Sequence, residues 1–183
     1  MIHEIKRFAS RFGVFALKIP SDLVEPLFDA IIAAMRIYFS GAIAGGRDNL
    51  PVYRHIVARL KSLGHSVPTE HVADPNVLAD ERVVAPRVVY ERDVAWIHES
   101  QAMIADISTP SLGVGYEIAC ALQRGLPTLC VYREGLFVSK MITGNPSPHL
   151  TIATYRDTAE LDRHIDTFLS QQLATETQRH GVL

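Results

Sequence analysis

Two acidic residues carry most of the chemistry that this sequence suggests, and the first is Glu117. It follows the block S-L-G-V-G-Y at 111–116, which comes after a short apolar strand, 102–105, and a polar turn beyond Asp106. A turn of this kind presents backbone N–H groups and hydroxyls to an anion. The helix that follows would hold Glu117 in its first turn, where the helix dipole favours an ionised carboxylate that can act as a nucleophile. Acidic residues also occur there for helix stability alone.

The second acidic residue is Asp93, in a helix predicted from about 87 to 100. The face that carries Asp93 is otherwise apolar, with Val89, Trp96 and Ile97 at helical spacing. An unpaired carboxylate on such a face is costly. Two interpretations stay open. Asp93 pairs with Arg92, Arg87 or a buried backbone donor, or it lies in a cleft where desolvation suits it to acid–base work.

A glycine-rich loop and a histidine extend this set. The predicted strand 36–40 ends in the loop G-A-I-A-G-G-R at 41–47, where glycines allow a ligand to approach the backbone closely. The loop is neither a dinucleotide fingerprint nor a P-loop, because the lysine and the required spacing are absent. His71 lies at the end of the predicted second strand, 66–72, a position that is more often structural than catalytic.

Strands and helices alternate along the chain and would bring these residues together. The predicted strands are 36–40, 66–72, 102–105, 126–132 and 150–155, with amphipathic helices between them. A short helix carries Ser139 and Lys140, a polar irregular linker occupies 75–86, and Asp157 caps the last helix. We therefore predict an α/β fold: a doubly wound, Rossmann-like five-stranded parallel sheet flanked by helices. Such sheets bind ligands at the carboxyl ends of their strands, which favours a small anionic ligand here.

Length and composition set the remaining limits. The chain has 183 residues, 48% of them hydrophobic, which fits one main domain with a sizeable core. Its net charge of -2 gives no general attraction to nucleic acid or membranes. No apolar run reaches membrane-spanning length. Residues 1–34 are predicted to form an N-terminal helical extension and 173–183 a loose tail. Cys120 and Cys130 are expected in the core of a cytoplasmic protein, and no Cys/His cluster has metal-binding spacing.

Five blocks of the sequence carry a family resemblance. They are I-Y-F-S-G-A-I-A-G-G-R at 37–47, T-E-H-V at 69–72, E-R-D-V-A-W at 91–96, S-L-G-V-G-Y-E at 111–117 and V-S-K-M-I at 138–142. Together they resemble the 2'-deoxynucleoside 5'-monophosphate N-glycosidases, relatives of the nucleoside 2-deoxyribosyltransferases. The resemblance implies that residues 35–172 are a nucleotide N-glycosidase domain, which works as a homodimer without metal or organic cofactor.

The resemblance also implies a role for each residue of the site. Glu117 would attack the anomeric carbon and form a covalent glycosyl intermediate, Asp93 would assist departure of the base and then activate water, and Tyr38 would orient Glu117. Two carboxyl groups are a known solution for cleaving a glycosidic bond. The predicted substrate-binding residues are Ser40, Gly41, Ile43, Arg47, His71, Ser111, Gly113 and Ser139. Of these, Ser111 and Gly113 would hold the 5'-phosphate, and Ser139 would reach the phosphate bound in the partner subunit.

One departure from the family pattern concerns the glycine-rich loop. The family loop often reads G-S-I-R-G-G-R, whereas this chain has Ala42 and Ala44 in place of the serine and the first arginine. That change bears on phosphate recognition and on the preference for deoxy over ribo sugars, and Arg47 is available to compensate. The alternatives are a deoxyribosyltransferase, a CMP-type ribonucleotide N-glycosidase and a non-catalytic nucleotide-binding module. Ser111 and Ser139 favour a phosphorylated substrate, and two carboxylates favour catalysis over binding alone.

Overall fold

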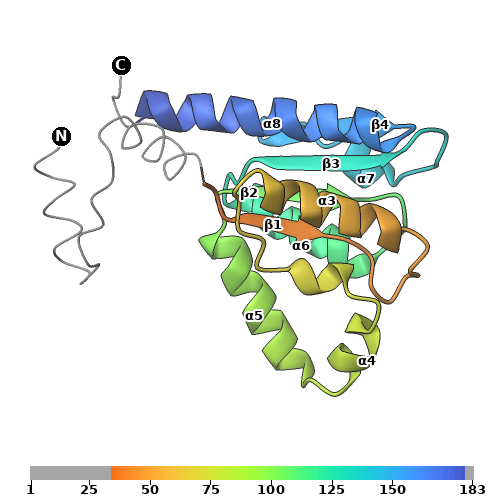
Figure 1. Cartoon of the computed structure of the whole chain (residues 1–183). Helices are drawn as coiled ribbons and strands as arrows, with labels where there is room; N and C mark the ends of the chain where they lie inside the picture. Colours follow the sequence, from red (N-terminus) through yellow and green to blue (C-terminus); the bar gives the residue numbers. More distant parts are fainter. Residues whose placement is uncertain (1–33, 180–183) are drawn as a thin grey trace, which may run out of the picture. The chain divides into compact units, whose positions relative to one another are not determined.

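A parallel sheet of four strands, in the order β1-β2-β3-β4, forms the centre of the computed structural model, which describes residues 34–179 (Figure 1). The strands are β1 (Ile37–Ser40), β2 (Ala102–Asp106), β3 (Thr128–Arg133) and β4 (Leu150–Tyr155). The helices are α3 (Leu50–Ser62), α4 (Val77–Arg82), α5 (Pro86–Glu99), α6 (Leu112–Gln123), α7 (Lys140–Thr143) and α8 (Thr158–Arg179), with a 3-10 helix, η1 (Glu70–Ala73). The predicted α/β class with a parallel sheet is confirmed.

The predicted second strand, 66–72, is not a strand, so the prediction of five strands is wrong. Only Ser66 pairs with the edge of β1, through a single parallel bridge. Pro68 has no N–H group to donate at the next position of the ladder, so pairing stops there. The N–H of Phe39 donates instead to the side chain of Thr69, at 2.9 Å. The chain then turns into η1, which places His71 in a 3-10 helix and not at a strand end.

The bridge at Ser66 still decides how the sheet is wound. It lies on the side of β1 opposite to β2, so the chain leaves β1 in one direction through α3 and returns in the other through α5. Crossovers of one hand that run in opposite directions place their helices on opposite faces of the sheet. The winding reverses between β1 and β2, and ligands of doubly wound sheets bind at such a point.

The two faces of the sheet have separate cores, because alternate residues of a strand point to opposite sides. One core lies under α3 and α8 and includes the strand residues Ile37, Phe39, Ile104, Leu129 and Val131. The other lies under α5, α6 and α7 and includes Tyr38, Met103, Ala105 and Cys130. Both faces are covered, which explains why most residues of β1, β2 and β3 are apolar. Tyr38 carries a polar group into the second core, and its hydroxyl has a partner in α6.

Three smaller expectations have clear outcomes. Asp157 caps α8 as predicted, since its side chain accepts a hydrogen bond from the N–H of Glu160 at 2.8 Å. The linker 75–86 is not wholly irregular, because it contains α4. Helix α8 continues to Arg179, several residues into the segment that the sequence predicted as a loose tail. The predicted N-terminal extension lies outside the described residues except for its last position.

None of the helices in the described range is both long and apolar enough to cross a membrane. Cys130 is buried and Cys120 half-buried, both as free thiols. This matches their prediction as core residues.

Candidate active site

Glu117 lies at the centre of the candidate site and reaches from α6 to β1. The Tyr38 hydroxyl donates a hydrogen bond to one carboxylate oxygen at 2.9 Å, and the Ser40 hydroxyl donates to the other. Tyr38 and Ser40 share one face of the sheet because they are two positions apart in a strand. They precede Glu117 by 79 and 77 residues in the sequence. The carboxylate is therefore fixed in direction by two donors on a rigid element.

The charge state of Glu117 differs from the prediction. Glu117 is the sixth residue of α6 and lies in its second turn, whereas the sequence placed it in the first turn. Burial raises its pKa to about 7, although the hydrogen bonds from Ser40 and Tyr38 lower it, and the neighbouring Asp93 and Glu81 raise it further. Desolvation of the charged form thus outweighs the expected stabilisation by the helix dipole. Near neutral pH the side chain is poised between its acid and its nucleophilic form.

Asp93 faces the same cavity from α5 and is paired. The Nε of Arg92 donates to Asp93 Oδ1 at 2.8 Å, and Nη2 donates to Glu81 Oε1 of α4 at 2.7 Å. The guanidinium lies 5.0 Å from the centre of the Trp96 ring, within the range of a cation–π contact. Pairing with Arg92, one of the two interpretations of the sequence, is therefore observed. Asp93 also lines the small cavity, while its role in acid–base chemistry stays a prediction.

Seven of the eleven predicted site residues line one narrow cavity of about 20 Å³, room for roughly one water molecule. They are Tyr38, Ser40, Gly41, Ile43, His71, Asp93 and Glu117. Burial raises the pKa of Tyr38, and the nearby Glu117 and Asp93 raise it further, so its hydroxyl stays a proton donor. Burial lowers the pKa of His71, and Arg92 adds to this, so a neutral imidazole borders the cavity.

The glycine-rich loop packs tightly beside this cavity. A Cβ at Gly41 would lie 2.9 Å from the ring of Tyr53, and one at Gly45 would lie 2.6 Å from the carbonyl oxygen of Pro110. Glycine is thus needed at both positions for close packing, and the loop touches the turn that precedes α6. Arg47 is turned away from the cavity: Nη2 donates to the carbonyl oxygens of Val72 and Asp74 at 2.8 and 2.7 Å. Its role as a phosphate ligand stays a prediction.

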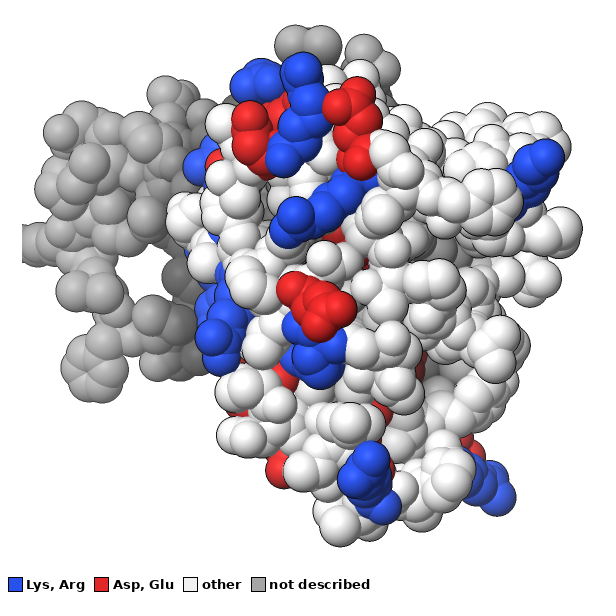
Figure 2. All heavy atoms as spheres, turned by 90° about the vertical axis from the view of Figure 1, so that its right-hand side faces the viewer, with Lys and Arg blue, Asp and Glu red and all other residues white. Residues whose placement is uncertain are grey.

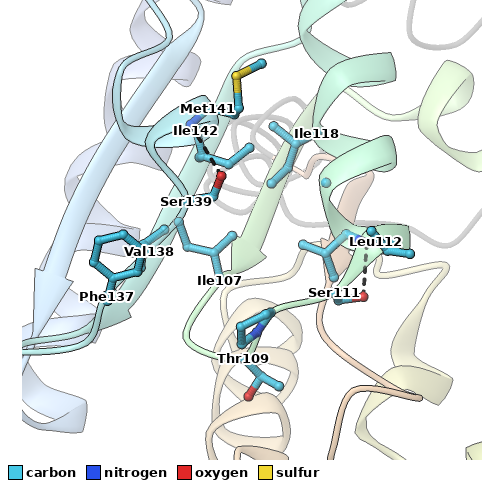
Figure 3. A pocket seen from close by; sticks show the side chains of 13 residues that line it. Ile107, Thr109, Ser111, Leu112, Ile118, Phe137, Val138, Ser139, Met141 and Ile142 are labelled. Carbon is cyan, nitrogen blue, oxygen red and sulfur yellow. Dashed lines mark hydrogen bonds between the residues drawn. The ribbon is translucent and has the colours of Figure 1, made fainter.

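Ser111 and Ser139 lie apart from the carboxylates, in a second and larger groove of about 530 Å³ (Figure 3). Each serine begins a helix: Ser111 accepts a hydrogen bond from the N–H of Val114 at the start of α6, and Ser139 from the N–H of Met141 at α7. Gly113 follows in the first turn of α6. Apart from Thr109, the other side chains of the groove are apolar. Its lining includes Ile107, Leu112, Ile118, Phe137, Met141 and Ile142.

Several apolar side chains beside this groove are open to solvent. Leu112 is 96% exposed, Phe137 84% and Met141 83%. On the neighbouring surface of α5 and α6, the rings of Tyr90 and Tyr116 are each about half exposed. Figure 2 looks at the side toward which β1 points: charged groups of both signs gather near the top of this view, and fewer are spread over the wide uncharged area below. We call the exposed residues Leu112, Tyr116, Phe137 and Met141 the apolar rim.

Sequence reasoning missed two buried polar residues, Thr69 just before η1 and Asp106 at the end of β2. Thr69 lines the small cavity and holds the N–H of Phe39. Asp106 is fully buried at the end of β2 and accepts hydrogen bonds from several directions. The polar residue at the end of an apolar strand was the available signal for Asp106. The signal for Thr69 was hidden, because its segment was predicted to be a strand.

The fold and the site define a class: a doubly wound α/β protein with two carboxylates where the winding reverses. Residues 37–145 match the family of nucleoside 2-deoxyribosyltransferases, so the chain belongs to that family.

Two curated relatives and one solved structure show how similar the chain is to known proteins. The chain is 40% identical over 118 residues to a protein of Methanococcoides burtonii, provisionally named 2'-deoxynucleoside 5'-phosphate N-hydrolase 1; the match covers 64% of this chain and 97% of the relative. It is 35% identical over 153 residues to the 5-hydroxymethyl-dUMP N-hydrolase of Rattus norvegicus, covering 79% and 93%. The CMP N-glycosidase of Clostridium botulinum has a similar fold, with a TM-score of 0.56 at 18% identity over 73% of this chain and 98% of that one.

Proposed function

We propose that this protein is a hydrolase that cleaves the N-glycosidic bond of 2'-deoxynucleoside 5'-monophosphates, giving free base and 2-deoxyribose 5-phosphate. The observation that carries the proposal is the buried carboxylate of Glu117, aimed by two hydroxyls into a cavity that it shares with Asp93. The names of the relatives from Methanococcoides burtonii and Rattus norvegicus support the substrate class.

The reaction proceeds in two displacements at the anomeric carbon. Ionised Glu117 attacks this carbon while the bond to the base breaks, and protonated Asp93 gives its proton to the departing base. A covalent glycosyl ester on Glu117 results. Asp93 then takes a proton from water, whose oxygen bonds to the anomeric carbon as the ester breaks and frees Glu117. Tyr38 and Ser40 hold Glu117 in line throughout, and both steps use only these side chains and water.

The arginine beside Asp93 has a consequence for the first step. Arg92 donates to Asp93, and the first step needs a proton on this carboxyl group. The same guanidinium also donates to Glu81 at 2.7 Å, so it is shared between two carboxyl groups. Burial gives Glu117 a pKa of about 7, so it also holds a proton in part of the free enzyme. Binding of substrate therefore has to leave the proton on Asp93 and the charge on Glu117.

The phosphate end of the substrate lies at the start of α6 in this proposal. Ser111 and the N–H groups around Gly113 offer neutral donors there, at the positive end of a helix dipole. The protein forms a homodimer, and Ser139 of the partner subunit completes the phosphate site. The apolar rim supports this arrangement, because exposed large apolar side chains beside a groove are typical of an interface. The two free thiols fit a reducing, cytoplasmic setting.

An end-point assay tests the proposal. The purified protein is incubated with each deoxynucleoside monophosphate, with the matching ribonucleotides and with unphosphorylated deoxynucleosides, and free base is measured by chromatography. We expect base and 2-deoxyribose 5-phosphate from deoxynucleotides only. Transfer of the sugar to a second added base would indicate a transferase, and release from ribonucleotides would indicate a CMP-type glycosidase. Tight nucleotide binding without any product would leave only a binding module.

The covalent intermediate has its own test. A substrate analogue with fluorine at the 2' position slows breakdown of the ester, so the enzyme should gain the mass of one fluorinated sugar phosphate. Mass spectrometry of peptides should place that mass on Glu117. An enzyme that turns over normally but never gains this mass would require direct attack by water.

A further inference from the structure

The most elaborate polar cluster outside the small cavity is centred on Asp106. This carboxyl group is fully buried at the end of β2 and is used by no step of the proposed reaction. Four hydrogen bonds reach it. Asn49 Nδ2 and the N–H of Ser108 donate to Oδ1 at 3.3 and 3.1 Å, and the hydroxyls of Tyr155 and Ser108 donate to Oδ2 at 2.8 and 3.3 Å.

The donors come from three separate parts of the chain. Ser108 belongs to the turn between β2 and α6, Tyr155 is the last residue of β4, and Asn49 precedes α3. Burial raises the pKa of Asp106, while the bonds from Tyr155 and Ser108 lower it. A buried carboxyl group is tolerated when donors of this number surround it. Asp106 thus connects three segments: the end of the glycine-rich loop region at Asn49, the turn between β2 and α6 at Ser108, and the end of β4 at Tyr155.

The side chain of Asn49 bonds to the Asp106 cluster instead of capping helix α3. An asparagine just before a helix usually caps it with its side-chain oxygen. Here Asn49 makes no such cap, and its amide instead bridges Asp106 and the Thr109 hydroxyl, each at 3.3 Å. The same turn touches the glycine-rich loop, where Pro110 leaves no space for a side chain at Gly45. The turn between β2 and α6 is therefore fixed by its hydrogen bonds to Asp106 and by its close contact with the glycine-rich loop.

We propose that Asp106 is the positioning residue for the phosphate end of the site: it fixes the turn that aims Ser111 and the first N–H groups of α6. This inference rests on the proposed function. It differs from a purely structural role because the turn leads directly into Ser111, only five positions after Asp106. Glu117 and Asp93 are held by other contacts, so loss of the carboxylate should loosen phosphate binding more than it slows the chemistry.

The test compares four proteins: wild type, Asp106→Asn, Asn49→Ala and Asp162→Asn. The last is the matched control, an Asp-to-Asn change in α8, where Asp162 pairs with His55 of α3 and makes no hydrogen bond to the Asp106 cluster. Each is assayed for kcat and KM with a deoxynucleoside monophosphate, and for inhibition by 2-deoxyribose 5-phosphate and by free base. We expect Asp106→Asn to raise KM and the Ki of the sugar phosphate about tenfold, with kcat within about threefold and the Ki of the base unchanged.

Asn49→Ala, which removes one donor and keeps the carboxylate, should shift the same two constants in the same direction by about threefold. It also carries the test if Asp106→Asn does not fold. Variants that melt at lower temperature but keep the wild-type KM and Ki would overturn the inference, since Asp106 would then serve stability alone. An inactive wild type is a different failure: it would refute the proposed function, while calorimetric binding of 2-deoxyribose 5-phosphate would still test Asp106.

Discussion

The two faces of the sheet differ in how completely their apolar side chains are covered. On one face, α3 and α8 lie over a continuous apolar core and are joined at their edges by two side-chain pairs, His55 with Asp162 at 2.7 Å and Arg59 with Asp166 at 2.8 Å. On the other face, α5, α6 and α7 cover a smaller core, and the apolar rim stands open to solvent.

The candidate catalytic residues all lie on the second face, under α5, α6 and α7. Glu117 and Asp93 come from α6 and α5, and Tyr38 reaches them because it is the strand residue that points to that side. The face under α3 and α8 supplies a platform and no candidate catalytic group. The difference supports the proposal that one face, the platform face, stabilises the fold, while the other, the active face, meets the substrate and the second copy of the proposed homodimer.

The largest effect is expected from Glu117→Gln. The amide keeps the shape of the side chain but cannot form the glycosyl ester, so kcat should fall by at least about 10³-fold with little change in substrate affinity. Steady-state kinetics and calorimetric binding measure the two quantities. A variant that retains a tenth of the wild-type kcat would exclude Glu117 as the nucleophile.

Asp93→Asn should rank second. Loss of a general acid typically costs about 10²–10⁴-fold in rate. The loss should be smaller for a nucleotide whose base leaves easily without a proton, because such a base has less need of the acid. The informative measurement is therefore the ratio of kcat for a poor and for a good leaving base, in wild type and variant. Equal losses on both bases would mean that Asp93 acts only through position.

Phe137→Asp should convert the protein to a monomer. A charge on this exposed ring, 84% open to solvent in the single chain, would be buried at the proposed interface. Activity should fall about tenfold, as expected for one lost hydrogen bond between the phosphate and Ser139 of the partner subunit. The matched control is Leu63→Asp at the end of α3, where a charge should leave the oligomeric state unchanged. Light scattering after size exclusion reads both; a wild-type monomer would refute the proposed dimer.

The pH dependence tests how burial acts on Glu117. Its pKa of about 7 predicts that kcat/KM rises with pH through this value, since the nucleophile must be ionised in the free enzyme. Ser40→Ala removes a donor that stabilises the ionised form, so the rise should move to higher pH. A rise that stays in place in Ser40→Ala would assign the titration to another group.

The same group affects stability with the opposite sign to an ordinary salt-bridged carboxylate. In the unfolded chain the Glu117 carboxyl group has its ordinary pKa of 4.5. The folded protein, with a pKa of about 7, therefore holds this proton more tightly. Stability is therefore lost as pH rises from about 4.5 to 7, by up to about 3 kcal/mol. Glu117→Gln should lack this loss, as melting curves at several pH values would show.

The smallest effect is expected from Asp162→Asn on the platform face. Both members of its pair with His55 are about one-third exposed, so the change should cost less than about 1 kcal/mol of unfolding free energy. The value of kcat should not change. Urea denaturation and steady-state kinetics measure the two; a large loss of activity here would show that the faces are not independent.

Local patterns were enough to predict much of this protein from its sequence. The strand, turn and helix around Glu117 follow from neighbouring residues, and so does the cap at Asp157. The prediction of a strand over 66–72 failed because the missing N–H of Pro68 matters only when β1 lies beside it, which the sequence alone does not show. The dipole argument for Glu117 failed for a related reason, since burial is a property of the assembled fold.

Long-range polar contacts were out of reach. Arg47 is available to an anion in the sequence, but in the fold it holds three backbone carbonyls, those of Ala42, Val72 and Asp74. The bond between Asp106 and Tyr155 spans 49 residues and has no sequence pattern of its own. Spacing arguments work within an element, whereas these contacts depend on which loops meet at the end of the sheet.

The long separation in sequence between Glu117 and its two donors determines when the site can form during protein synthesis. Tyr38 and Ser40 leave the ribosome 79 and 77 residues before Glu117, which at common rates of synthesis is roughly 4–16 s earlier. In that interval β1 has no neighbour at β2, and afterwards the strands must still find each other across a long loop. With Glu117 as the proposed nucleophile, no nascent or prematurely terminated chain that lacks α6 can release a base. The first base released during synthesis would then mark the moment when β1 and α6 have come together.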